Sequence, residues 1–159
     1  MKGKLYTGRI YEHRKIKHHY PDVLLVCVMR WAPKRIDLKK SKILHLQALS
    51  PSANLLTRYK KKMQKKKMSL REKEAIWKNF VTDYVTQIQK DSKAQDERFF
   101  IRSLLAKGTK ITLLCHEGIN EDCHRRILPD LLLTEKELKK GVYCGEVSFE
   151  ETIQMKLDL

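Results

Sequence analysis

The chain has 159 residues, a formal net charge of +15 and a hydrophobic content of 42%. This length suffices for one domain with a hydrophobic core, and we expect residues 1–159 to form a single domain. The longest apolar run, Val23–Met29, is far shorter than a membrane span. The N-terminus has no apolar signal segment, and four irregularly spaced cysteines do not resemble a disulfide scaffold. We therefore expect a cytoplasmic protein with free thiols and no membrane partner.

The excess of positive charge favours polyanionic partners, such as nucleic acid or a phosphorylated small molecule. A lysine-rich, solvated surface would give the same total charge. High lysine and glutamate content is also typical of thermophilic proteins. Both interpretations stay open, and the oligomeric state is not predicted.

The first half of the chain predicts two strands and two helices. Lys4–Tyr6 is a short strand, and Val23–Met29 has the continuous apolar character of a strand buried on both faces of a parallel sheet. Ser50 can cap the first helix, with Pro51 at its first position. Ser69 begins the second helix with a capping-box pattern. Its apolar stripe is explained by core packing.

The second half predicts a polar loop at Asp91–Gln95, a helix at Phe99–Leu105 and another buried strand at Ile111–Leu114. A short helix is predicted from Cys123, and a last strand or irregular edge at Val142–Phe149. Helices long enough to connect parallel strands favour an α/β fold. We expect one three-layer domain with a mostly parallel sheet and helices on both faces.

Reactive side chains gather where the strand Ile111–Leu114 ends. Cys115 lies at the carboxyl end of this strand, where open α/β sheets bind ligands. Cys123 lies at a predicted helix start, where the helix dipole and nearby cations would lower a thiol pKa. Glu117 and His124 are candidates for proton transfer. These four residues are the predicted catalytic groups, and the pattern suits a cysteine nucleophile acting near a phosphate-like group.

Each of these residues taken alone is more often structural, as a core cysteine, a locally bonded histidine or a surface arginine. Their clustering within eleven positions favours a functional site. A phosphatase loop does not fit, because Arg125 follows Cys115 by ten positions. Glu117 also puts an anion where a rhodanese-type loop would have donors.

A zinc site is a further interpretation of the same cluster. Cys115, His116, Cys123 and His124 could supply two sulfur and two nitrogen ligands. The spacing lacks a paired cysteine knuckle, and adjacent Cys123 and His124 are expected to point in different directions. We therefore predict no metal and no cofactor.

The segment Leu113–Glu117, followed by Cys123-His124-Arg125, resembles the signature of domain-of-unknown-function family 488. Segments around Leu5–Thr7, Val26–Arg30 and Leu49–Ser52 resemble other parts of the family in the same order. The resemblance extends from about Lys4 to about Leu133 and implies a compact α/β domain with one pocket. The residues that it implies there are Cys115, Glu117, Cys123, His124, Arg125 and Arg30.

Arg30, Arg125, Tyr6 and Trp31 are thus the predicted anion- and substrate-binding residues. The family's usual aspartate before its valine-arginine pair is absent, since Val28 and Met29 precede Arg30 here.

Two classes of function follow, and the sequence does not decide whether the protein is an enzyme. The first is a cysteine-dependent enzyme acting on a nucleotide, nucleic acid or other phosphorylated substrate. The second is a non-catalytic nucleic-acid-binding domain that uses the basic region Arg58–Lys73. The lysines predicted to contact phosphates in that second case are Lys60, Lys61, Lys62, Lys65, Lys66 and Lys67.

Overall fold

The computed structural model describes residues 1–118 and 121–149 of the chain. At the centre of this part lies a five-stranded sheet with the order β3-β2-β4-β1-β5. Every pair of neighbouring strands is parallel, so the predicted parallel sheet is confirmed. The strands are β1 (Lys4–Arg9), β2 (Leu24–Cys27), β3 (Ile43–His45), β4 (Lys110–Cys115) and β5 (Tyr143–Val147).

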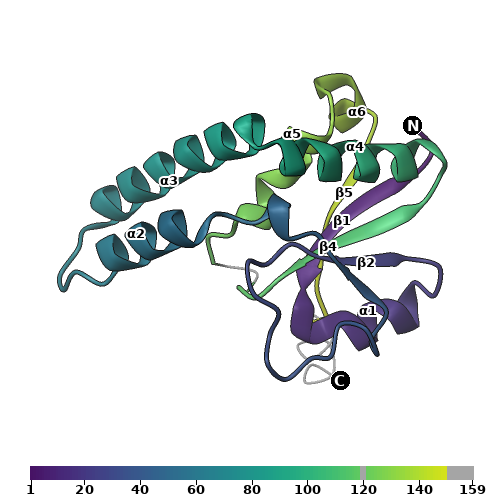
Figure 1. The fold of residues 1–159 in the computed structure, drawn as a ribbon, viewed down its shortest axis with the longest axis horizontal. Coiled ribbons are helices and arrows are strands. Elements are labelled where there is room, and N and C mark those ends of the chain that lie inside the picture. Colours follow the sequence, from purple (N-terminus) through teal and green to yellow (C-terminus); the bar gives the residue numbers. More distant parts are fainter. Residues whose placement is uncertain (119–120, 150–159) are drawn as a thin grey trace, which may run out of the picture.

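Helices cover both faces of the sheet, as predicted (Figure 1). The first helix packs on one face, and the other helices belong to the opposite face. The second and third helices form a hairpin that extends beyond the sheet (Figure 1). The α-helices are α1 (His13–His19), α2 (Ala53–Met63), α3 (Leu70–Lys90), α4 (Ser92–Ala106), α5 (Leu128–Leu132) and α6 (Glu135–Lys139). Among the described residues, no helix is both long and apolar enough to cross a membrane.

The alternation of side chains along β4 separates two hydrophobic cores. Ile111 and Leu113 pack in the larger core, which α2 to α6 cover. Leu114 points to the other face and packs with Ile10 and Ile16 in the smaller core. Full burial of one such side chain stabilises the fold by about 1.5–3 kcal/mol. Both faces of β4 are therefore apolar for a structural reason, as its continuous hydrophobic run predicted.

The predicted start of the first long helix is wrong by two residues. Ser52, not Ser50, caps α2, because its Oγ accepts a hydrogen bond of 3.2 Å from the Leu55 amide. Ser50 is buried, and its hydroxyl donates to the Gln47 carbonyl at 2.6 Å. Pro51 therefore lies outside the helix.

The predicted loop at Asp91–Gln95 is also wrong, apart from its first residue. The Asp91 carboxylate accepts hydrogen bonds from the amides of Lys93 and Ala94, at 2.9 and 3.3 Å. This cap starts α4 at Ser92. A capped first turn is rich in polar residues, which explains why the segment resembles a loop in the sequence.

The predicted start of the second long helix is confirmed, and other helix ends have similarly clear local signals. Ser69 and Glu72 form a complete capping box at the start of α3, and Thr134 and Glu137 form one at α6. Gly108 follows the end of α4 with a φ of 97°, a conformation that favours glycine.

Two elements, α1 and β3, have no recognisable signal in the sequence. α1 buries only His13 and Ile16, so its sequence is polar almost throughout. β3 has three residues, too few for an alternating pattern to be visible. Both elements form because the neighbouring parts of the sheet provide a surface for them.

The sheet topology brings three strand ends together. β4 lies between β1 and β2, which precede it in the chain, so the chain changes direction across the sheet at this point. Arg9 pairs with Cys115, and Cys27 pairs with Leu114. The carboxyl ends of β1, β2 and β4 therefore share one edge, the usual place for a ligand site in such a sheet.

Candidate functional site

Two thiols and a carboxylate converge at the carboxyl end of β4. Cys115 is the last residue of β4, and Cys123 precedes a short 3-10 helix, His124–Arg126. The Sγ atoms of Cys115 and Cys123 lie 3.0 and 3.1 Å from the same oxygen, Oε2 of Glu117. Each cysteine is only 3% exposed. While both thiols are protonated, this carboxylate oxygen can accept a hydrogen bond from each of them.

The imidazole of His124 lies between the thiols and β2. Its Nδ1 is 4.0 Å from the Sγ of Cys115 and 3.9 Å from that of Cys123. Its Nε2 is 2.7 Å from the Val28 carbonyl oxygen. Because a carbonyl can only accept, Nε2 carries a hydrogen, and Nδ1 faces the thiols. Tyr84 packs edge-on against the imidazole, with 5.5 Å between ring centroids, and so helps to fix its orientation.

The cluster shifts the two thiol pKa values in opposite directions. Burial alone raises the pKa of Cys123, but hydrogen bonds with Cys115 and His124 outweigh burial and lower that pKa to about 6. The pKa of Cys115 is raised well above its usual value, first by its hydrogen bond with Cys123 and then by burial. Burial lowers the pKa of His124, but the adjacent Cys123 thiolate outweighs burial and raises it. Cys123 therefore ionises first, beside an imidazolium, and Cys115 keeps its proton.

Glu117 is ionised in this arrangement. Burial raises its pKa, but hydrogen bonds from Cys115 and Cys123 outweigh burial, so the net shift is downward. Once Cys123 loses its proton, its contact with Glu117 becomes a repulsion between two anions. The proton of Cys115 then lies between two acceptors, the thiolate of Cys123 and the carboxylate of Glu117.

Two expectations about Cys123 are wrong. It precedes a 3-10 helix of three residues rather than an α-helix, so a macrodipole does not account for its lowered pKa. Its neighbours Cys115 and His124 account for it instead. Cys123 and His124 also do not point apart, because Sγ and Nδ1 are 3.9 Å from each other.

Arg125 and Arg126 hold the loop that follows β4. Arg125 is completely buried and pairs with Glu146 of β5. Arg126 Nε donates to the same carboxylate at 2.9 Å, and both guanidinium groups donate to the Gly118 carbonyl. Within the described residues, Nε and Nη1 of Arg125 have no hydrogen-bond partner. Its charge also lies near Cys123 and Cys115, where it favours a thiolate.

A pocket of about 150 Å³ opens beside the thiols. Cys115, Glu117 and His124 line it, together with Arg30 and Trp31 from the segment after β2. The thiol on the pocket wall is therefore the protonated one, and the ionised Cys123 lies behind it. Its mixed lining of apolar, aromatic and polar side chains is typical of small-molecule sites.

Helix α2 closes the pocket on another side. Leu56 and Lys60, one turn apart on this helix, belong to the lining. No sequence signal connected Lys60 to Cys115, because they are far apart in the chain and meet only through the packing of α2. The same holds for Glu146 as the partner of Arg125.

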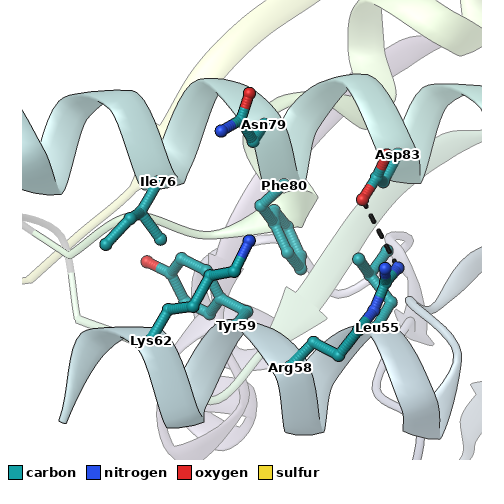
Figure 2. A pocket seen from close by; sticks show the side chains of 8 residues that line it. All are labelled: Leu55, Arg58, Tyr59, Lys62, Ile76, Asn79, Phe80 and Asp83. Carbon is teal, nitrogen blue, oxygen red and sulfur yellow. Dashed lines mark hydrogen bonds and ion pairs between the residues drawn. The ribbon is translucent and has the colours of Figure 1, made fainter.

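The remaining predicted residues lie elsewhere. Tyr6 stacks on Tyr20, with ring centroids 5.6 Å apart, and does not line the pocket beside the thiols. Lys61 is exposed on α2, and Lys62 lines a separate groove between α2 and α3 (Figure 2). Lys65–Lys67 are exposed in the turn that joins these helices.

Three of the clustered side chains could hold a metal ion. The ligand atoms of Cys115, Cys123 and His124 all lie within 4.8 Å of one another. The hydrogen bond from His124 Nε2 to the Val28 carbonyl is the kind of contact that orients a metal-binding imidazole.

Fold and site together define an α/β protein with a buried centre of two thiols, an imidazole and a carboxylate at the carboxyl edge of a parallel sheet. Residues 9–136 match DUF488-N3a, described as the active DUF488-N3 subclade. The chain therefore belongs to the DUF488 family, which confirms the resemblance seen in its cysteine motif. Comparisons with curated proteins and with solved structures returned no match.

Proposed function

We propose that the protein is a cysteine-dependent enzyme that acts on a nucleotide, a nucleic acid or another phosphorylated substrate. The observation that carries this proposal is the convergence of Cys115, Glu117 and His124 at the wall of one pocket, with Cys123 in contact behind them. A thiol, a proton acceptor for it and a proton donor for a leaving group are the parts that covalent catalysis needs. Arg30 on the same wall supports an anionic substrate.

In this proposal Cys115 is the nucleophile, because it lines the pocket. Its sulfur bonds to the electrophilic atom of the substrate while its proton passes to the thiolate of Cys123. The bond to the leaving group breaks, and the leaving group takes a proton from the imidazolium of His124. A water molecule then attacks the covalent intermediate and gives a proton back to His124. Cys115 leaves with the electron pair and recovers its proton from Cys123, so the net reaction is hydrolysis.

Glu117 and Arg125 are positioning residues in this scheme. Glu117 accepts from Cys115 and keeps the thiol aligned. The buried charge of Arg125 offsets the negative charge of the Cys123 thiolate.

Alkylation with iodoacetamide, followed by mass spectrometry of each cysteine, tests the proposal. Exposed Cys144 provides the internal reference. We expect Cys115 or Cys123 to be labelled at neutral pH in the folded protein, and inorganic phosphate or a nucleoside monophosphate to slow that labelling. Labelling of Cys144 alone, at every pH at which the protein stays folded, would overturn the nucleophilic role.

The second candidate is a zinc site, and the mutual distances within 4.8 Å favour it. Elemental analysis of protein purified without added metal tests it. One equivalent of zinc, lost in Cys115→Ser and retained in Cys27→Ser, would support this candidate and overturn the free-thiol enzyme. Cys27 is a suitable control, because it is buried in the smaller core.

A further inference from the structure

The thiol pocket and the basic helix are one continuous surface. Lys60 of α2 lines the pocket that also contains Cys115 and Trp31. Lys60 belongs to the last turn of α2, which also carries Lys61 and Lys62. A ligand bound at the thiols therefore lies beside the basic end of α2.

Trp31 gives this pocket an aromatic wall. Its indole is 57% exposed, although it belongs to the pocket lining. An aromatic plane at such a position can stack on a nucleobase, which is worth about 1–3 kcal/mol per base. The exposed indole thus adds an attraction for bases to a site that otherwise attracts phosphate.

Arg30 provides a fixed cation next to the indole. Its Nε donates to the Pro51 carbonyl at 3.1 Å, which holds the guanidinium at the pocket wall. Its two terminal amino groups make no hydrogen bond to any residue in the described ranges. These groups are suited to a bidentate contact with phosphate.

Several lysines of the α2–α3 hairpin are free to contact a phosphate backbone. On its inner side Arg58 is paired with Asp83 at 3.4 Å, as the dashed line in Figure 2 indicates. Lys60, Lys61 and Lys66, in contrast, are exposed and have no ion pair with a described residue. Unpaired lysines at the end of α2, of which Lys60 reaches the aromatic pocket, suit the binding of a phosphate backbone whose base stacks in that pocket.

We infer that the substrate of this pocket is a single-stranded nucleic acid, whose backbone follows the lysines of α2 and whose base stacks on Trp31 beside Cys115. This inference rests on the proposed function and names its substrate class. A single strand fits better than a duplex, because a base must leave its stack to enter a pocket of about 150 Å³. Removing a base from a duplex costs a few kcal/mol.

Fluorescence anisotropy with a labelled oligothymidylate of about 16 nucleotides tests the inference. We expect the single strand to bind more tightly than a duplex of equal length. The triple variant Lys60→Ala, Lys61→Ala, Lys66→Ala should reduce the slope of log affinity against log salt by about 2. The matched control is Lys90→Ala, Lys93→Ala, Lys107→Ala, which removes three exposed lysines away from the basic last turn of α2 and should leave affinity for the strand nearly unchanged.

Stacking is tested separately with Trp31→Leu and Trp31→Phe. We expect Trp31→Leu to weaken binding about 10-fold and Trp31→Phe to retain most of it. The bound single strand should also slow iodoacetamide labelling of Cys115, whereas labelling of Cys144 stays constant.

The inference would be overturned if the two triple lysine variants lost equal affinity for the single strand. It would also be overturned if the duplex bound as tightly as the single strand, or if no binding were seen at low salt. Labelling of Cys115 in the protein without DNA reports on the proposed function alone. A reactive Cys115 that no strand protects would therefore overturn only the choice of substrate.

Discussion

The charged groups of the thiol cluster are largely buried and paired, whereas the lysines of the α2–α3 hairpin are exposed and unpaired within the described residues. In the cluster, Arg125 and His124 are buried, and each has a defined partner, Glu146 and Cys123. On the hairpin, lysines such as Lys66 are exposed and have no ion pair in the described part of the chain. Buried charges change stability and pKa values strongly, whereas exposed charges act mainly on binding. We therefore expect charge to affect folding much more in the thiol cluster than on the hairpin.

The largest effect is expected at Glu146. The variant Glu146→Ala leaves the buried guanidinium of Arg125 without its carboxylate partner. This should lower the free energy of unfolding by about 3–5 kcal/mol. Urea denaturation measures this change. The control is Glu135→Ala, which removes an exposed pair with Lys139 and should cost less than about 1 kcal/mol. Similar losses in both variants would contradict the contrast between buried and exposed charge.

The next effect concerns the ionisation of Cys123. The ultraviolet absorbance of the thiolate should rise with pH through about 6, because the pKa of Cys123 is lowered by hydrogen bonds that outweigh burial. His124→Asn removes the imidazolium and should move this inflection upward by at least about one pH unit, equivalent to about 1.4 kcal/mol.

His13→Asn is the matched control for this titration. His13 is also a buried histidine, but its Nδ1 forms its hydrogen bond with the nearby Ile10 carbonyl, at 2.8 Å, and not with a thiol. The inflection should stay in place in this variant. The absence of an inflection near pH 6 in the unmodified protein would refute the assignment of an ionised Cys123.

A smaller loss of stability is expected at Tyr84 of α3, which packs against the thiol cluster. The Tyr84 hydroxyl donates to the Leu49 carbonyl at 2.5 Å, and its ring packs on His124. Tyr84→Phe keeps the ring but leaves a buried carbonyl unpaired, so it should lower stability by about 1–2 kcal/mol. Thermal and urea unfolding measure this loss. Tyr11→Phe, at an exposed tyrosine, should change stability by less than about 0.5 kcal/mol.

The smallest change in stability is expected on the hairpin. The triple variant Lys60→Ala, Lys61→Ala, Lys66→Ala should stay within about 0.5 kcal/mol of the unmodified protein per substitution, because exposed lysines stabilise little. Calorimetry at matched salt checks this. A large loss of stability in this variant would show that the hairpin lysines stabilise the fold. It would contradict the proposed contrast between exposed charges on the hairpin and buried charges in the thiol cluster.

Much of the architecture was predictable because its signals are local. The apolar runs around Val26 and Leu113 predicted buried parallel strands, and the capping box at Ser69 predicted the start of α3. Predictions failed where one residue type fits two structures. Ser50 and Ser52 are both possible caps, and only the packing of α2 distinguishes them.

The sequence by itself determined that Cys115 and Cys123 would lie near each other, because a strand end and a loop of a few residues separate them. It did not determine their different ionisation, which depends on the position of His124 between the thiols and the Val28 carbonyl. Only the tertiary structure decided that Lys60 would join this pocket and that Glu146 would bind Arg125. These contacts join segments far apart in the chain, and their geometry depends on how the helices and strands pack, which no local pattern encodes.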